Sequence, residues 1–237
     1  MGRAYEVRKA SIAKTGVAKA KMYSTYAKEI YSAAKKSTDP DANPTLKRLI
    51  EKAKRDQIPS DIIKRAIDKV NSGIDENYLS VRYEGFGPSN STIIVECLTD
   101  NVNRTVGFVR GAFNKAKAKL GVNGSVAHMY DHLCIISYKG LTEEETIEAL
   151  VNDDVDIVDI EIEEDMVTVY GNPSDLYKIK NAITKVKPDI NFEVDEIAMF
   201  PKETISLEGE DLDQFNKLLS QLDDIEDVNQ VYHNVNL

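Results

Sequence analysis

The chain has 237 residues, of which 42% are hydrophobic and 30% charged, and its formal net charge is −10. This length and apolar content suit two or three small globular domains. No stretch approaches the roughly 18 to 20 consecutive apolar residues of a membrane span, and the N-terminus lacks an apolar signal core, so we expect a cytoplasmic protein without a membrane partner. The two cysteines, Cys97 and Cys134, lack CxxC spacing, so neither a disulfide scaffold nor a zinc knuckle is implied, and we expect both to be small buried hydrophobic residues.

Charge is distributed unevenly along the chain. Residues 1–73 contain 17 Lys and Arg against 8 Asp and Glu, residues 74–140 contain 7 against 6, and residues 141–237 contain 6 against 26. The three segments therefore have net charges of +9, +1 and −20. Clustered Lys and Arg indicate a polyanionic partner, which would repel the acidic remainder. The split predicts nucleic-acid binding through the first segment.

Three helices are predicted in residues 1–76, which makes a basic all-α domain. Between residues 17 and 36 apolar residues recur at helical spacing, and a cationic stripe on the opposite side consists of lysines seven apart: Lys14, Lys21, Lys28 and Lys35. A merely solvated face is the alternative interpretation. A second helix begins after the N-cap Asn43 and directs basic residues away from its apolar face: Lys47, Arg48, Lys54 and Arg55. The third helix ends at Gly73.

Beyond residue 76 the pattern changes to strands alternating with helices. Strands are predicted at 91–99 and 124–131, with a helix at 103–119 between them. Residues 133–199 follow the β-α-β-β-α-β order of a ferredoxin-like domain. The predicted strands are 133–138, 155–162, 166–170 and 192–199, and the helices are 142–151 and 174–186. Strands at 204–207 and 228–235 flank a helix at 210–222 and would complete, with residues 91–131, a second unit of the same kind.

The predicted fold class is therefore α+β and multidomain. A three-helix domain is followed by two α/β domains of the ferredoxin-like split β-α-β type, one inserted in the other. Because short connections favour such nesting, we expect domains at 1–76, at 77–131 plus 203–237, and, as the acidic insert, at 132–202.

The sequence contains no recognisable catalytic or cofactor-binding constellation. Gly85-Phe86-Gly87-Pro88 precedes a strand and includes a proline, which favours a tight loop over a phosphate loop. His128 and His132 lie in a predicted extended segment, roughly 13 Å apart and too distant to share a metal ion. The acidic runs fit no calcium loop and are interpreted as solvated faces. We therefore expect no enzymatic activity, no cofactor and no small-molecule substrate.

A polar run, residues 99–105, lies between a predicted strand and a predicted helix. Arg104, beside the free amides of the helix N-terminus, could hold a phosphate. Asn101 or Asn103 could instead cap the helix, and the preference of Asn for that position favours capping.

Three runs in chain order carry a resemblance to a known family. These are RYEGFGP at 82–88, ECLTDNVNRT at 96–105 and NGSVAHMYD at 123–131, and they resemble the signature of the YebC/PmpR family. Residues 40–44, 52–54 and 58–67 are similar to its helical domain, and residues 231–234 to its C-terminal end. The Met1-Gly2-Arg3 start resembles the YeeN-like branch. The run Lys117-Ala118-Lys119 departs from the Gly-Gly pair of many members.

The resemblance implies a three-domain, cytoplasmic, non-enzymatic protein. Members are commonly described as probable transcriptional regulators that bind DNA. Other members, including mitochondrial relatives, are linked to translation and to ribosomes stalled on proline-rich stretches. The nucleic acid could thus be DNA or ribosomal RNA.

The leading hypothesis is a nucleic-acid-binding regulator of gene expression that acts as a monomer. Basic residues without an aromatic stacking platform or helix-turn-helix predict phosphate contact and low sequence specificity. The predicted contact residues are Arg3, Arg8, Lys9, Lys14, Lys21, Lys28, Lys35, Lys47, Arg48, Lys54, Arg55 and Arg104. One alternative is a ribosome-associated translation factor. The other is a protein-interaction module whose acidic domains dock on a basic partner or fold back and mask the basic domain.

Overall fold

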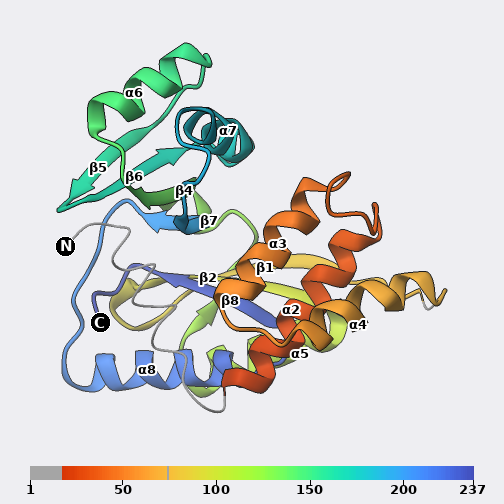
Figure 1. Cartoon of the computed structure of the whole chain (residues 1–237). Coiled ribbons are helices and arrows are strands. Elements are labelled where there is room, and N and C mark those ends of the chain that lie inside the picture. Colours follow the sequence, from red (N-terminus) through yellow and green to blue (C-terminus); the bar gives the residue numbers. More distant parts are fainter. Residues whose placement is uncertain (1–17, 74) are drawn as a thin grey trace. The chain divides into compact units, whose positions relative to one another are not determined.

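The computed structural model describes residues 18–73 and 75–237, which form seven α-helices and eight β-strands. They group into two compact units (Figure 1). Of the described residues, one unit comprises Tyr130–Lys202, and the other combines those from 18 to 129 with Glu203–Leu237. Helices together with two antiparallel sheets confirm the α+β class. Among the helices of the described ranges, none is long and apolar enough to cross a membrane.

Three helices open the larger unit: α2 (Ala18–Ala34), α3 (Pro44–Arg55) and α4 (Ser60–Asn71). Their apolar faces enclose a core that contains Tyr26, Ile30, Tyr31, Leu46, Leu49, Ala53 and Ile63. Asn43 caps α3 as predicted, because its Oδ1 accepts a hydrogen bond from the Leu46 amide at 3.2 Å. Its Nδ2 also donates to the carbonyl oxygen of Ala33 at 2.8 Å, which ties the start of α3 to the end of α2.

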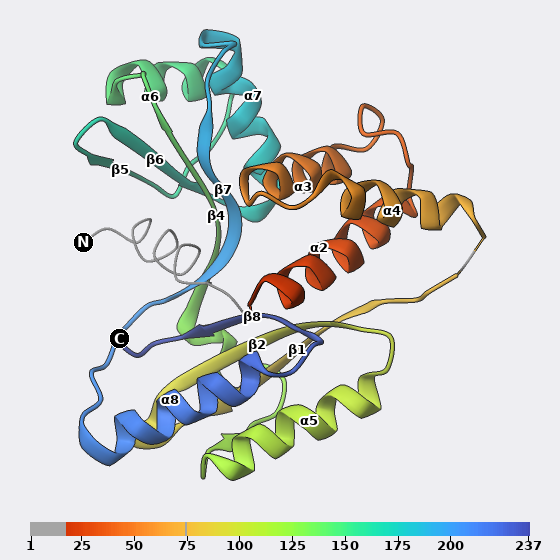
Figure 2. The ribbon, with the colours of Figure 1, turned by 60° about the horizontal axis from the view of Figure 1, so that its bottom comes forward.

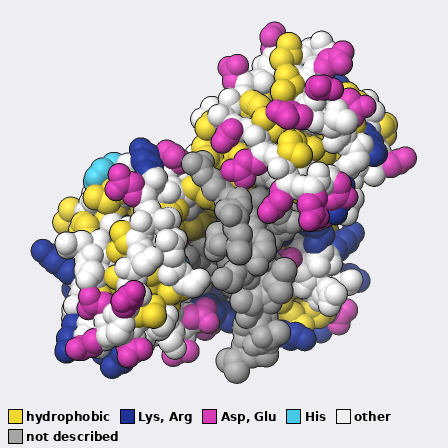
Figure 3. Space-filling model, turned by 90° about the vertical axis from the view of Figure 1, so that its left-hand side faces the viewer, with side chains coloured by type: hydrophobic (Ala, Val, Ile, Leu, Met, Phe, Trp, Pro, Cys, Tyr) yellow, Lys and Arg dark blue, Asp and Glu magenta, His cyan; other side chains and the backbone are white. Residues whose placement is uncertain are grey.

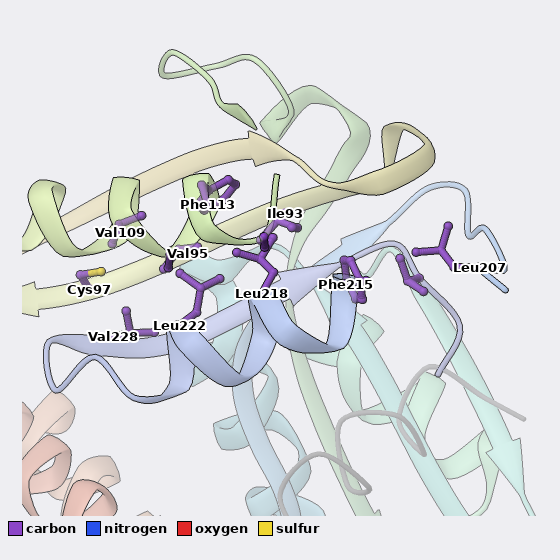
Figure 4. Packing of buried hydrophobic residues seen from close by; sticks show 13 residues of the cluster. Ile93, Val95, Cys97, Val109, Phe113, Leu207, Phe215, Leu218, Leu222 and Val228 are labelled. Atoms are coloured by element: carbon purple, nitrogen blue, oxygen red, sulfur yellow. The ribbon is translucent and has the colours of Figure 1, made fainter. Parts of the chain in front are cut away.

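The rest of this unit is a four-stranded sheet with strand order β3-β1-β2-β8. The strands are β1 (Leu79–Phe86), β2 (Thr92–Thr99), β3 (Lys119–Leu120) and β8 (Val228–His233). Helices α5 (Val102–Lys115) and α8 (Gly209–Asp223) lie side by side on one face (Figure 2). Figure 4 shows Phe113 of α5 and Leu218 of α8 directed toward Ile93 of β2, and these three side chains are fully buried. Removing such side chains from water is the main stabilising contribution.

This sheet contains a second split β-α-β unit, as predicted. Strands β2 and β3 are joined through α5, and β1 lies between them and pairs antiparallel with both. The central strands of the sheet, β1 and β2, are consecutive and pair directly as a hairpin. Strand β1 was not predicted, although Leu79, Val81 and Tyr83 alternate with polar residues as a strand requires. The predicted strand at 204–207 is reduced to one parallel bridge between Ile205 and Val235.

The predicted strand at 124–131 is also wrong. Residues 121–126 form a loop, and a 3-10 turn (Ala127–Met129) precedes a strand that begins at Tyr130. The cause is Glu84, whose buried carboxylate accepts hydrogen bonds from the backbone amides of Gly124, Val126 and Ala127 at 2.7–2.8 Å. Backbone amides that donate to a side chain are not available for the hydrogen bonds between the strands of a sheet.

The smaller unit has the ferredoxin-like arrangement that the sequence predicted. Its elements are β4 (Tyr130–Lys139), α6 (Glu143–Asn152), β5 (Asp159–Glu163), β6 (Met166–Gly171), α7 (Leu176–Val186) and β7 (Phe192–Pro201). The strand order is β5-β6-β4-β7, with every neighbouring pair antiparallel. Strand β4 begins earlier than predicted, and it crosses the proposed boundary at residue 132. The division of the larger unit into two domains stays a prediction.

Candidate nucleic-acid interface

Two lysines of the α2 stripe are bound by carboxylates from the end of α8 and the segment that follows it. Lys21 Nζ lies 3.0 Å from Asp223 Oδ1, and Lys28 Nζ lies 3.2 Å from Asp227 Oδ1. Glu226 is a second partner of Lys28, at 3.5 Å. We call residues 223–227 the acidic turn. The side chains of Lys21 and Lys28 retain only 21% and 11% of their exposure, so this part of the stripe is covered.

Lys35, the last lysine of the predicted stripe, has other partners. Lys35 Nζ lies 2.6 Å from Asp75 Oδ1 and also donates to Asn77 Oδ1 at 2.8 Å, so this lysine is held by the segment after α4. The remaining predicted contacts of the N-terminus lie outside the described residues: Arg3, Arg8, Lys9 and Lys14.

Asp227 connects the stripe to the α/β part of the unit. Its Oδ2 accepts hydrogen bonds from Arg104 Nη2 and Thr105 Oγ1, both at 2.8 Å, and its side chain is 6% exposed. Burial alone would raise the pKa of this carboxyl, but hydrogen bonds from Arg104, Thr105 and Lys28 outweigh burial and lower the pKa. The carboxylate is therefore charged at neutral pH.

Arg104 is oriented by its own helix. Asn101 caps α5 by accepting the Arg104 amide at 3.0 Å, which confirms the capping interpretation. The Arg104 guanidinium is held between Asp100 and Asp227, at 2.7 and 2.8 Å. Beside it is a depression of ≈ 420 Å³ whose lining includes the cations Lys28 and Arg104 and three carboxylates. Such a lining has no net attraction for a phosphate.

The predicted basic residues of α3 remain on the surface. Lys47, Lys54 and Arg55 are exposed, and Arg48 is half-buried. We call these four residues the α3 basic face. The ion pair of Lys47 with Asp41, at 3.2 Å, joins two exposed side chains and is weak, so a phosphate can compete for that lysine.

A second group of exposed cations was not predicted from the sequence. It lies on the C-terminal half of α5, in the turn after it and on β3, and consists of Arg110, Lys115, Lys117 and Lys119. The signal was present, because residues 101–130 contain no Asp or Glu. Averaging the charge over residues 74–140 concealed it.

The other candidates from the sequence have structural explanations. Gly85-Phe86-Gly87-Pro88 ends β1 and enters a tight turn in which the Gly87 amide donates to the Ser91 carbonyl oxygen at 2.8 Å. Cys97 and Cys134 are buried, as predicted, and burial raises their thiol pKa values to about 12 and about 11. In the described ranges no group of three or more His, Cys, Asp and Glu side chains is arranged to hold a metal ion.

These features define a class: an α+β protein with a basic helical part and a strongly acidic ferredoxin-like unit. Two family models match, the TACO1/YebC protein N-terminal domain over residues 3–73 and the TACO1/YebC second and third domain over residues 78–235. The chain belongs to the TACO1/YebC family, which confirms the predicted resemblance. Its assignment to the YeeN-like branch stays a prediction.

Relatives cover the chain from end to end. A protein of Vibrio parahaemolyticus named a probable transcriptional regulatory protein is 49% identical over 238 residues, covering 100% of both chains. A Marinobacter nauticus protein with the same descriptive name is 50% identical and covers 100% of this chain and 99% of its own. The crystal structure of a conserved hypothetical protein from Aquifex aeolicus matches with a TM-score of 0.73 and 30% identity, covering 92% of this chain and 90% of that one.

Proposed function

We propose that this protein is a non-enzymatic regulator of gene expression that binds DNA through the phosphate backbone. The observation that supports the proposal most directly is the α3 basic face, in which Lys47, Lys54 and Arg55 are exposed. The names of the relatives, probable transcriptional regulatory proteins, favour DNA as the target and transcription as the process. We further propose that it acts in the cytoplasm as a monomer without a cofactor.

Charge segregation supports a defined orientation on the nucleic acid. The unit Tyr130–Lys202 contains 18 Asp and Glu against 6 Lys and Arg. Figure 3 shows many Asp and Glu side chains on this unit, in the upper part of the view. Phosphates repel this surface and attract the α3 basic face. Because phosphate contacts position a protein without reading bases, we expect low sequence specificity.

The test is removal of the α3 basic face. A variant with Lys47→Gln, Arg48→Gln, Lys54→Gln and Arg55→Gln is compared with a control of equal charge change, Lys178→Gln, Lys185→Gln, Lys187→Gln and Lys202→Gln, in the acidic unit. Duplex DNA binding is measured by fluorescence anisotropy at several salt concentrations. We expect the first variant to lose affinity and the control to keep it. With about six phosphate contacts the wild-type slope of log K against log salt is about −5, and the variant's slope should be shallower by about three. Equal affinities for both variants would contradict the proposal.

Ribosomal RNA is the alternative target. Structured RNA is recognised largely by shape and by backbone contacts, which the same basic face could make. Co-sedimentation with ribosomes at moderate salt, measured beside duplex DNA binding, separates the two. Retention on ribosomes with negligible DNA affinity would move the proposed role from transcription to translation.

A further inference from the structure

The contact between α2 and the acidic turn consists of polar groups, including the backbone carbonyl oxygen of Asp223, to which Lys21 Nζ donates. Besides the pairs of Lys21 and Lys28, Ser24 Oγ donates to Glu226 Oε1 at 3.0 Å. Just past the turn, Asn229 Nδ2 donates to Glu29 Oε1 at 3.1 Å. Thus one face of α2 meets the acidic turn along two helical turns, from Lys21 to Lys28.

Apolar packing does not reinforce this contact. The core of the helical part is formed by residues of α2–α4 with Ile58, and Tyr78 is the one residue packed against it from beyond α4 within the described ranges. The core between the sheet, α5 and α8 includes no residue of α2. A contact that depends on charges at the surface is weakened by salt and by competing ions, whereas an apolar one is not.

We propose that the acidic turn is an intramolecular mimic of nucleic-acid phosphates, an ionic latch that occupies the α2 stripe and competes with nucleic acid for Lys21 and Lys28. The inference rests on the proposed function, because it concerns the regulation of the same nucleic-acid interface. Carboxylates of Asp223, Glu226 and Asp227 take the places that phosphate oxygens would take on the stripe. When the latch opens, the stripe joins the α3 basic face in binding.

The latch predicts that removing negative charge from the turn strengthens binding. The variant Asp223→Asn/Glu226→Gln keeps Asp227, whose buried carboxylate also holds Arg104 and Thr105. The control, Glu203→Gln/Asp213→Asn, removes two exposed carboxylates elsewhere and changes the net charge equally. We expect the latch variant to bind duplex DNA about three- to tenfold more tightly than the control, from two surface ion pairs.

The salt dependence provides a second readout. In the wild type, phosphates that reach Lys21 and Lys28 displace carboxylates of the turn, and not counterions. In the latch variant Lys21 holds a counterion, whereas Lys28 still pairs with the retained Asp227, so the slope of log K against log salt should become steeper by about one. Affinity and slope equal to those of the control would overturn the latch.

Amine footprinting tests the latch without nucleic acid. The full-length protein is treated with an acetylating reagent, and the acetylation rate of each lysine is measured by mass spectrometry. Lys21 and Lys28 should react more slowly than the exposed Lys54 in the wild type. Lys21 should react faster in the latch variant, in which Lys28 keeps its partner Asp227, and both lysines should react faster at high salt. Rates equal to that of Lys54 in the wild type would overturn the latch. If the proposed function were wrong, the variant without the α3 basic face would instead bind DNA as tightly as the wild type.

Discussion

The side chain of Asp227 links α2, α5 and β2. One carboxylate holds a lysine of α2, an arginine and a threonine of α5, and Thr99 of β2, with the Thr99 hydroxyl at 3.2 Å. Removing a carboxylate with so many charged and polar partners should lower the free energy of unfolding strongly. The partners would stay partly buried and would lose the negative charge that balances them.

We expect Asp227→Asn to destabilise the protein by about 3 kcal/mol, since Lys28 and Arg104 lose their shared counter-charge. Urea unfolding followed by circular dichroism measures the effect. The control is Asp224→Asn, an exposed neighbour in the acidic turn, which should change the free energy of unfolding by less than about 0.5 kcal/mol. Similar losses in both variants would show that the contacts of Asp227 are not the cause.

Glu84 should produce a pH dependence of stability. Burial raises the pKa of this carboxyl, but hydrogen bonds from the amides of Val126, Gly124 and Ala127 outweigh burial and lower the pKa below its ordinary value of 4.5. A lowered folded-state pKa contributes stability that is present above pH 4.5 and is lost as the pH falls through the folded-state value.

The measurement is the free energy of unfolding between pH 7 and pH 3 for the wild type and Glu84→Gln. The variant should be less stable at pH 7 by about 1 to 3 kcal/mol, because the three amides keep a weaker acceptor. Below pH 4.5 it should lose stability less steeply than the wild type. If the free energy of unfolding fell equally with pH in both proteins, protonation of Glu84 would not contribute to the loss.

At the residue scale, contacts between residues close in the sequence were predictable, and contacts between residues far apart in the sequence were not. The cap Asn43 was identified from its own neighbours, and the cap of α5 was narrowed to Asn101 or Asn103, because a cap acts within three residues. The partners of Lys21 and Lys28 lie 202 and 199 positions away in the sequence. Periodicity placed these lysines on one helical face but gave no information on what covers that face.

At the element scale, close packing between β1 and α5 makes one glycine necessary. A Cβ at Gly85 would lie 2.3 Å from Phe113 Cε1 and 2.7 Å from the Lys119 carbonyl oxygen. We expect Gly85→Ala to destabilise the protein by about 1 to 3 kcal/mol, because neither the ring nor the backbone can move freely.

The control for that substitution is Gly107→Ala in the same region. A Cβ at the helical Gly107 would meet no atom within 4 Å, so this variant should stabilise the protein by about 0.5 to 1 kcal/mol through helix propensity. Thermal unfolding of both variants beside the wild type is the measurement. A stabilised Gly85→Ala variant would contradict the packing argument.

The elements differ in how far their sequences specified them. The unit Tyr130–Lys202 was predicted well, because its strands and helices have contrasting periodicities and short connections. The β3 region was not, because the Lys- and Ala-rich end of α5 favours a longer helix than the structure has. The helix stops at Lys115, and Lys117 adopts a positive φ of 55° that turns the chain toward β1.

At the scale of the whole molecule, the smaller unit has the form of an independent insert. Its first and last strands pair along their length, with Tyr130 opposite Pro201, so the two points where the chain enters and leaves it are about 5 Å apart. Its core contains residues of β4–β7, α6 and α7, with the loops between them, and none from the larger unit within the described ranges.

We therefore expect a fragment of residues 130–202 to fold alone and the remaining chain, with Met129 joined to Glu203 by a short Gly-Ser linker, to keep its secondary structure. Cooperative thermal unfolding of each piece, followed by circular dichroism, is the measurement. The linked chain should still bind duplex DNA, because the α3 basic face is retained. An unfolded fragment would show that the insert depends on its host.

The two buried cysteines make this protein convenient for site-specific labelling. With thiol pKa values of about 12 and about 11, Cys97 and Cys134 have almost no thiolate at neutral pH, and neither is at the surface. A cysteine introduced at an exposed position would therefore react with a maleimide dye far faster than either native thiol. Fluorophores could be attached to the native background, with no need to replace a core residue first.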